Sequence, residues 1–353
     1  MPSVAVFSSD VAVIGAGITG LATAYALRRR GVEFRLFEEA APGFGQSAGR
    51  TRVFRHGHDD PRLVELAVRA YGEWERLEAE LGVPLLGRQG VLLCGPNIGE
   101  RASAFEEAGV RSRMVNRDEQ RGALPVLRPP EDEALLDEVG GFIDVRAAVD
   151  SLSRAVRDEL VPARVFEVAE GGTGSLEVRT SEGLWTAGRA IICAGAQTQR
   201  LARGLGLDIP LRNEIHTRAT FDVSEPGASL ACLLDRSGVH GEVVYASPMP
   251  DGRQFAVGLA GDEEPPADQA LARLAAYAER ALPGVDPDPA GARLCEASTL
   301  PWGADAFAVW RTGNVDVLAG ANLFKFAPLL GELLAERSGE LAPEHRLGRG
   351  QTP

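Results

Sequence analysis

The chain has 353 residues, 44% of them hydrophobic and 25% charged, which is enough for a large core and about two domains. Its formal net charge of −13 argues against a nucleic-acid surface, which would need a basic patch. It has no run of about 20 apolar residues that could span a membrane and no pattern of a secretory signal. Four scattered cysteines without a CxxC pair argue against a zinc site or disulfide framework and fit a reducing cytoplasm. We therefore expect a cytoplasmic monomer or small homo-oligomer that binds neither nucleic acid nor membrane.

The N-terminal region predicts a strand–helix–strand unit. Residues 11–14 are an apolar strand, residues 15–20 form a Gly-x-Gly-x-x-Gly turn, and residues 21–30 have the apolar spacing of a helix. A second strand, 34–37, ends in Glu38. Because the glycine motif lies between a strand and a helix and an acid follows the second strand, it indicates a dinucleotide site rather than an ordinary turn.

Each glycine of the motif has a separate expected task. Gly15 permits the tight turn, Gly17 lets the backbone approach a diphosphate, and Gly20 lets helix and strand pack closely. The diphosphate would lie at the N-terminus of the helix. Glu38 would accept hydrogen bonds from a ribose hydroxyl, and its charge disfavours the 2′-phosphate of NADP, which leaves FAD or NAD. A second polar, glycine-rich segment at 45–52 favours FAD, because a flavin ring needs such backbone amides.

The rest of the chain alternates between two kinds of structure. The apolar spacing of residues 61–81 predicts a long amphipathic helix ended by Gly82, and residues 145–160 predict another helix. Alternating strands between residues 210 and 289 predict an antiparallel sheet. The predicted fold class is α/β, with a Rossmann-like FAD-binding domain interleaved with an antiparallel-sheet substrate domain. We expect residues 1–82, 140–205 and 291–340 in the FAD-binding domain, 83–139 and 206–290 in the substrate domain, and 341–353 in a charged tail.

Four segments match motifs of a known family. Residues 49–56 read Gly-Arg-Thr-Arg-Val-Phe-Arg-His, and residues 318–332 contain Leu-Ala-Gly, Phe-Lys-Phe-Ala-Pro and Gly-Glu. Residues 193–196 and 141–144 match more weakly. In these segments the chain resembles the monomeric sarcosine oxidase and N-methyltryptophan oxidase branch of the D-amino-acid-oxidase-like flavoproteins. The resemblance spans almost the whole chain in the expected order and implies a fold like that of D-amino-acid oxidase and glycine oxidase.

The resemblance also implies roles for individual residues. Arg55 and Lys325 would hold the substrate carboxylate, as a bidentate fork and a point charge respectively. A helix beginning near Phe326 would direct its positive end at the N1–C2=O edge of the flavin. Cys295 falls where the family attaches FAD covalently, and the alternative is a small buried thiol. Arg52 and Tyr245 would complete the catalytic centre, and further flavin contacts would be Gly45, Ser47, Thr51, Arg52, Ala194, Gly195 and Phe324.

Three alanines and a short loop depart from the family pattern. The family places a lysine beside the flavin to help oxygen react, and the alignment puts Ala256 there. Lys325 is the only lysine in the chain, so no other lysine can take that role. Ala260 and Ala297 stand where a histidine and a tyrosine are expected, and the loop 321–323 is shorter than the family's. These departures imply a slower reaction with oxygen and a larger, more apolar substrate than sarcosine.

Other polar residues have competing interpretations. Residues 56–60, His-Gly-His-Asp-Asp, could bind a metal, but their spacing matches no known ligand set, and we predict no metal site. Tyr245 would either line the pocket or lie within its sheet. His216 is more typical of a strand surface than of a pocket. No motif predicts a Ser-His-Asp triad.

The expected activity is FAD-dependent oxidation of a small-molecule secondary amine, or of an N-substituted or cyclic amino acid, to an imine. The imine would hydrolyse, and oxygen would be reduced to hydrogen peroxide. The arginine-rich composition suggests a GC-rich bacterium, in which such enzymes often serve secondary metabolism. One alternative is a dehydrogenase with an electron acceptor other than oxygen, because the flavin-side lysine is missing. Another is a flavin-binding protein that no longer catalyses.

Overall fold

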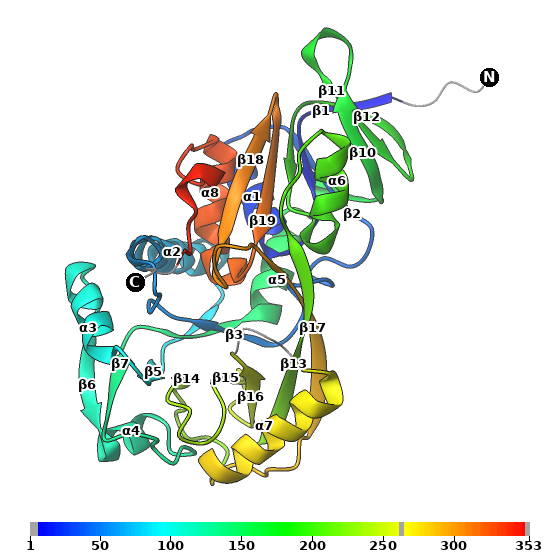
Figure 1. Cartoon of the computed structure of the whole chain (residues 1–353). Coiled ribbons are helices and arrows are strands. Elements are labelled where there is room, and N and C mark those ends of the chain that lie inside the picture. Colours follow the sequence, from blue (N-terminus) through cyan, green and yellow to red (C-terminus); the bar gives the residue numbers. More distant parts are fainter. Residues whose placement is uncertain (1–5, 261–264, 350–353) are drawn as a thin grey trace.

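The computed structural model describes residues 6–260 and 265–349 and consists of two halves (Figure 1). The first domain, at the top of Figure 1, contains the N-terminal strand–helix–strand unit. The second domain, at the bottom, contains the expected antiparallel sheet. Two long strands, β13 (Arg212–Asp222) and β17 (Gly291–Thr299), extend from the region between the halves down into the second domain.

An eight-stranded sheet forms the centre of the first domain. Its strands are β1 (Val6–Ile14), β2 (Phe34–Glu38), β9 (Leu160–Pro162), β10 (Val165–Glu170), β11 (Leu176–Thr180), β12 (Gly183–Ile192), β18 (Phe307–Thr312) and β19 (Val315–Gly320). β1 pairs in parallel with β2 and β12, and β19 pairs in parallel with the end of β12. The N-terminal crossover predicted from the glycine motif is therefore confirmed.

Helices cover both faces of this sheet. One layer contains α1 (Ile18–Arg29), α2 (Pro61–Leu81), α5 (Val145–Ala155) and α8 (Ala327–Glu336), and α6 (Thr198–Gly204) lies on the other side. In β1, Val11 and Val13 pack into the first layer, whereas Ala12 and Ile14 pack on the α6 side. Side chains alternate along a strand, so a continuous apolar run is what a sheet covered on both faces requires.

The second domain is built on another eight-stranded sheet, in the order β17-β13-β16-β15-β14-β5-β7-β6. Its other strands are β5 (Val91–Cys94), β6 (Ser112–Asn116), β7 (Glu133–Asp137), β14 (Cys232–Asp235), β15 (Val244–Pro248) and β16 (Gln254–Leu259). α7 (Ala267–Ala281) packs against one face through Leu274 and Tyr277, over Phe221 and Phe255. α3 (Ile98–Glu107) and α4 (Arg117–Ala123) lie at the β6 end (Figure 1). All but one of the strand pairs are antiparallel, since only β14 and β5 run in parallel.

A small sheet lies between the two domains and leads into the site. It consists of β3 (Thr51–Phe54), β8 (Gly141–Asp144) and β4 (Leu86–Gly87). The predicted helix 61–81 follows β3 and has the predicted ends. Asp60 caps its first turn by accepting from the Arg62 amide, and Gly82 ends it in the left-handed conformation.

Three expectations about the chain's organisation are corrected. Residues 291–299 form β17, which pairs with β13 along its length, so this segment belongs to the sheet of the second domain and not to the first. The helix predicted for residues 145–160 ends at Ala155. Residues 341–349 of the expected tail are packed, with Leu341 and Leu347 buried in the core of the first domain; residues 350–353 lie outside the described residues.

Candidate functional site

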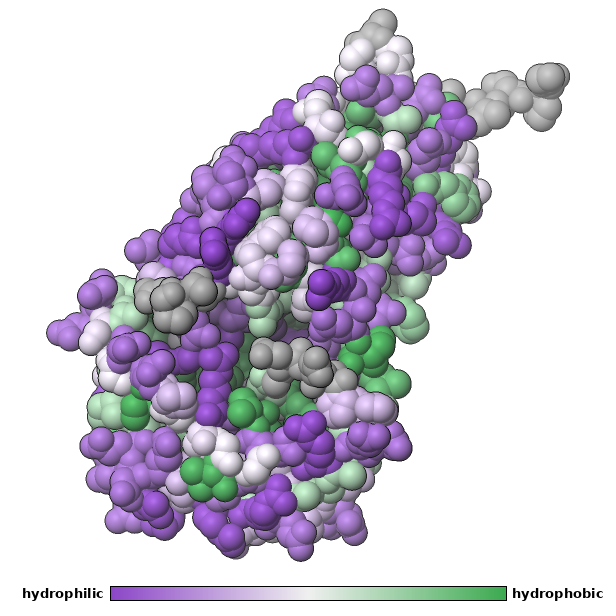
Figure 2. Space-filling model, in the orientation of Figure 1, coloured by the Kyte–Doolittle hydropathy of each residue, from purple (hydrophilic) through white to green (hydrophobic). Residues whose placement is uncertain are grey.

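A cavity of about 820 Å³ lies between the domains. Its floor is the start of α1 and the end of β2, and its opposite wall is formed by β13 and β17 of the second domain. This volume is near the upper end of what small-molecule sites enclose, so a large cofactor and a substrate could share it. In the space-filling view, hydrophobic residues gather at the surface between the two halves, at the level of this wall (Figure 2).

The glycine turn has the close packing that its sequence predicted. A Cβ on Gly20 would lie 1.9 Å from the carbonyl oxygen of Gly15, and Gly15 itself has φ +98°. No other residue fits these two positions without moving the strand away from the helix. The amide of Ile18 at the helix start donates to Ser47 Oγ at 2.9 Å, which fixes the polar loop over the turn.

The end of β2 carries the acid expected to hold a ribose. The Glu38 carboxylate lines the cavity and accepts from the amides of Ala16 (2.7 Å) and Ala40 (3.0 Å). These two amides hold the carboxylate at the edge of the glycine turn. Ala194 and Gly195 line the same part of the cavity.

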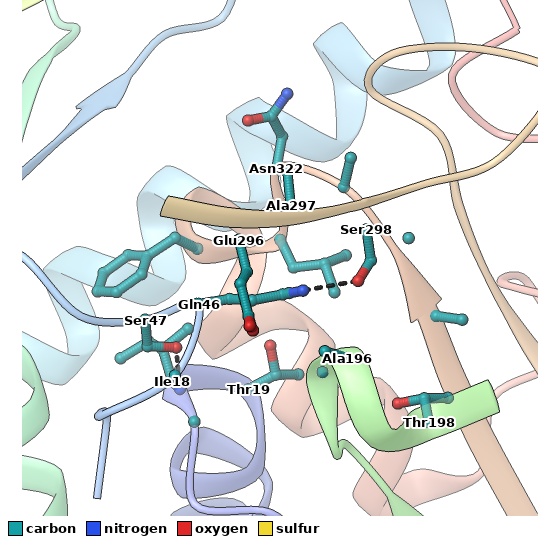
Figure 3. A pocket seen from close by; sticks show the side chains of 18 of the residues that line it. Ile18, Thr19, Gln46, Ser47, Ala196, Thr198, Glu296, Ala297, Ser298 and Asn322 are labelled. Carbon is teal, nitrogen blue, oxygen red and sulfur yellow. Dashed lines mark hydrogen bonds between the residues drawn. The ribbon is translucent and has the colours of Figure 1, made fainter. Parts of the chain in front are cut away.

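The loop 45–47 reaches across the cavity to the second domain (Figure 3). Gln46 Nε2 donates to Ser298 Oγ of β17 at 2.6 Å, and Ser298 in turn donates to Asn213 of β13 at 2.8 Å. Glu296 of β17 points into the same space, toward Thr19 at the start of α1 (Figure 3). This loop therefore joins the dinucleotide turn to the wall of the second domain.

A carboxylate of the protein itself lies at the expected carboxylate clamp. Arg55 follows β3 directly, and its Nη2 donates to Asp305 at 2.7 Å. His58 Nδ1 lies 2.8 Å from the same Asp305 oxygen, and Asn322 donates to the other one. The charges of Arg55 and Lys325 and the hydrogen bond from His58 hold the pKa of Asp305 well below its usual range against the effect of burial. Burial, together with Lys325 and Arg55, lowers the pKa of His58 well below its usual value, so His58 is neutral and donates Nδ1–H to Asp305.

Lys325 lies in the short helix η4 (Leu323–Phe326), before α8, and only 5% of its surface is exposed. The indole of Trp74 in α2 donates to the Lys325 carbonyl at 2.7 Å, which fixes the backbone here. Burial and the nearby Arg55 lower the pKa of Lys325 to about 7, against the opposing effect of Asp305. Among the described residues, no carboxylate lies within 4.0 Å of its ammonium group. Lys325 and Arg55, which are 270 residues apart in sequence, thus meet at one end of the cavity.

Arg52 has different partners from those expected of a catalytic residue. Its guanidinium donates to three backbone carbonyls, those of Thr51 (2.9 Å), Gln46 (3.2 Å) and Ala48 (2.6 Å), and lies 5.7 Å from the centre of the Phe324 ring. Burial and the charge of Arg218 lower the pKa of Arg52 to about 9. These bonds make Arg52 the residue that holds the loop 46–51 in shape beside the cavity.

The two histidines of the segment 56–60 face different partners. His56 Nδ1 lies 3.0 Å from Asp137, which also accepts from the amides of His56 and Gly140, whereas His58 binds Asp305. Within residues 6–260 and 265–349, no group of three or more histidine, cysteine or acidic side chains could hold a metal. The two histidines therefore bind two different carboxylates, His56 that of Asp137 and His58 that of Asp305.

The wall of the second domain brings several candidates to the cavity. Tyr245 of β15, His216 of β13 and Cys295 of β17 all line it, and His216 and Cys295 are directly opposite each other across the two strands. Ala260 and Ala297 line it as well, so it is wider here than histidine and tyrosine would leave it. Ala256 lies further along β16, opposite Ser247, whose hydroxyl is 3.3 Å from that of Thr51.

Sequence reasoning missed two residues of this site. Asp305 lies in the loop between β17 and β18, outside any recognised motif, and is 250 residues from Arg55. Arg218 lies in β13 and donates to the Tyr245 hydroxyl at 2.9 Å. The only available signal was a charged residue within a strand otherwise expected to be half-buried, which is too common to single out Arg218.

Three comparisons with known proteins agree with this geometry. A family model described as FAD dependent oxidoreductase matches residues 10–337. The chain is 28% identical to the human peroxisomal sarcosine oxidase, covering 96% of this chain and 94% of the human one. It is 25% identical to an N-methyl-L-tryptophan oxidase of Salmonella arizonae, over 96% of each chain.

Solved structures share the fold. NikD, described as an unusual amino acid oxidase essential for nikkomycin biosynthesis, superposes with a TM-score of 0.82 at 22% identity and covers 98% of this chain and 99% of its own. Glycine oxidase from Geobacillus kaustophilus gives a TM-score of 0.80 at 18% identity, with 98% and 100% covered. No helix among the described residues is long and apolar enough to cross a membrane.

The cradle of Gly15, Gly20, Glu38 and Ser47 fits a dinucleotide, and the cavity continues from it to the cations of the clamp. With the family match, this fit identifies the cofactor as FAD and the protein as an oxidoreductase. The chain belongs to the family of FAD dependent oxidoreductases.

Proposed function

We propose that this enzyme oxidises a secondary amine carrying a carboxylate, that is, an N-substituted or cyclic amino acid, to the corresponding imine. The observation that carries the proposal is the meeting of Arg55 and Lys325 around Asp305 at the cavity. Two cations share one internal carboxylate, so protonated Lys325 leaves a net positive charge for a substrate carboxylate. The names of the relatives, sarcosine oxidase and N-methyl-L-tryptophan oxidase, support a secondary amine.

FAD would supply the two-electron acceptor for hydride from the carbon that bears the nitrogen. The residues of this chain orient that carbon. Arg55 and Lys325 hold the carboxylate, and Tyr245 of the second domain lines the same cavity. Fixing the substrate at two points is how a protein turns a bimolecular step into an effectively unimolecular one. The imine product then hydrolyses in water, or is released intact if it is cyclic.

Oxygen is the proposed final electron acceptor, and hydrogen peroxide the second product. A dehydrogenase with another acceptor is the second candidate, and one observation favours it. The only lysine of the chain, Lys325, lies in the clamp, and Ala256 occupies the position where the family's oxygen-activating lysine aligns. One solved structure of this fold is described as an L-proline dehydrogenase.

One experiment tests the activity and separates these candidates. The purified flavoenzyme is mixed without oxygen with primary, N-methylated and cyclic amino acids, and the flavin absorbance is followed. Air is then admitted. Loss of colour with N-substituted or cyclic amino acids and prompt return in air supports the oxidase. Loss of colour without return supports the dehydrogenase, and no loss of colour with any amine contradicts the proposal.

A matched pair of variants tests the clamp itself. Arg55→Met removes the fork that faces the substrate, whereas Arg253→Met removes an exposed arginine of the second domain that does not line the cavity. Arg55→Met should raise KM about 10- to 100-fold, which corresponds to the loss of a charge-assisted hydrogen bond. An unchanged KM in Arg55→Met for every active substrate would contradict the clamp.

A further inference from the structure

The second domain contributes to the cavity a cation that pairs with no acid among the described residues. Arg218 of β13 lies opposite Gly258 of β16, and Gly258 lies opposite Tyr245 of β15. The three residues thus form one row across the sheet. Arg218 and Tyr245 both line the cavity.

Gly258 makes the pairing of the other two residues possible. A Cβ at position 258 would lie 2.4 Å from the Tyr245 hydroxyl, so any other residue would displace the ring. With glycine there, Tyr245 lies across the strand, and the Arg218 guanidinium carbon lies 4.9 Å from the ring centre. Arg218 Nε donates to the Tyr245 hydroxyl at 2.9 Å. The hydroxyl accepts this bond, so its own proton is available to another acceptor.

The rest of the Arg218 guanidinium lacks partners. The bond to Tyr245 uses Nε, and neither terminal nitrogen is bonded to a residue of the described chain. No described carboxylate pairs with Arg218, and the groups whose charges favour its protonated form are the Tyr245 phenol and the Cys295 thiol. Arg52, the other cation nearby, is satisfied by three carbonyl oxygens, and Arg55 by Asp305. Two free terminal nitrogens in one plane match the two oxygens of a carboxylate.

We propose that Arg218 and Tyr245 form a second anion site, which binds a second carboxylate of the substrate. This inference rests on the proposed function, because the first carboxylate is assigned to Arg55 and Lys325. The substrate class then narrows to N-substituted amino acids with an acidic side chain or an acidic N-substituent. A monocarboxylic amino acid would leave the Arg218 charge desolvated and unpaired, and the site would select against it.

Equilibrium binding tests the second site without turnover. The flavoenzyme is titrated with unreactive straight-chain dicarboxylates of three to seven carbons and with monocarboxylates of the same lengths, and the shift of the flavin spectrum is followed. We expect at least one dicarboxylate to bind about 10- to 100-fold more tightly than its monocarboxylate, the range for one charge-assisted hydrogen-bonded contact. Equal binding of the two series would overturn the inference while leaving the clamp intact.

Variants assign the preference to Arg218. Arg218→Met should abolish the preference for dicarboxylates over monocarboxylates. Arg218→Lys, which keeps the charge without the fork, should retain part of that preference. The control Arg253→Met should retain the whole preference. Loss of FAD from Arg218→Met but not from Arg253→Met would show that Arg218 serves the cofactor, and would overturn the proposal.

Two substrates that differ only in the charge of the side chain test the second site during turnover. N-methylglutamate should reduce the flavin at least about 10-fold more efficiently than N-methylglutamine, which has the same shape but a neutral side chain. Equal reduction by both would contradict the second site alone. Binding of neither series of carboxylates, with no reduction by any amino acid, would remove the proposed function together with it.

Discussion

If Lys325 binds the substrate carboxylate as proposed, we predict that carboxylate binding depends on pH. Its pKa of about 7 in the free protein means that its charge is lost as the pH rises through neutrality. The neighbouring groups keep one charge state over the same range. The pKa of Asp305 and that of His58 both lie well below their usual ranges, so Asp305 stays ionised and His58 stays neutral while Lys325 titrates.

The size of the effect follows from this pKa. A carboxylate ligand binds the ammonium form of Lys325 better than the neutral form. Its affinity is therefore highest well below pH 7 and falls as the pH rises. With a free-protein pKa of about 7, the dissociation constant should rise about 10-fold by pH 8. If the Lys325 contact contributes about 2 kcal/mol, the rise should level off at about 30-fold near pH 9, where neutral lysine no longer attracts the ligand.

The assay is a flavin absorbance titration with an unreactive monocarboxylate at pH 6 to 9, which avoids the titration of an amine substrate. Lys325→Met provides the comparison, since methionine is similar in length and carries no charge. Its affinity should be independent of pH and close to the high-pH value of the wild-type enzyme. A wild-type dissociation constant that varies less than about twofold over this range would refute the reasoning. An equal rise of the dissociation constant in Lys325→Met would refute it as well.

Three further variants test the remaining parts of the site. Asp305→Asn removes the internal carboxylate that raises the Lys325 pKa, so the midpoint of the pH dependence should move down by about 1 to 3 pH units, to the lower end of the titrated range or below it. A midpoint that stays near pH 7 in the same titration would contradict this prediction. Cys295→Ser tests whether the flavin is covalently attached to Cys295. Acid precipitation should leave the flavin bound to the wild-type protein and release it from the variant. Release of the flavin from both proteins would exclude the linkage. Gly20→Ala places a methyl group 1.9 Å from a backbone oxygen, so the variant should lose FAD and be about 1 to 3 kcal/mol less stable, as measured by flavin content and denaturant titration. Full flavin content would argue against the tight turn.

Some elements of the fold can be predicted from local sequence alone. The helix 61–81 was predictable at both ends, because Asp60, Pro61 and Gly82 act on the nearest turn. The glycine turn was predictable for the same reason, since strand, turn and helix are consecutive. The domain boundary near residue 291 was not predictable from local sequence. β17 belongs to the second sheet only because it pairs with β13, which lies about 80 residues earlier in the chain.

The sequence alone therefore determined the dinucleotide cradle, and its resemblance to a family indicated Arg55 and Lys325 as the cations of the proposed clamp. Only the tertiary structure determined their charge balance. Asp305 reaches Arg55 across 250 residues, and Arg218 meets Tyr245 through the register of three strands, with Gly258 between them. Such pairs have no local signature, because sheet register and loop position are set by burial across the whole domain, whereas a turn is set by its own backbone.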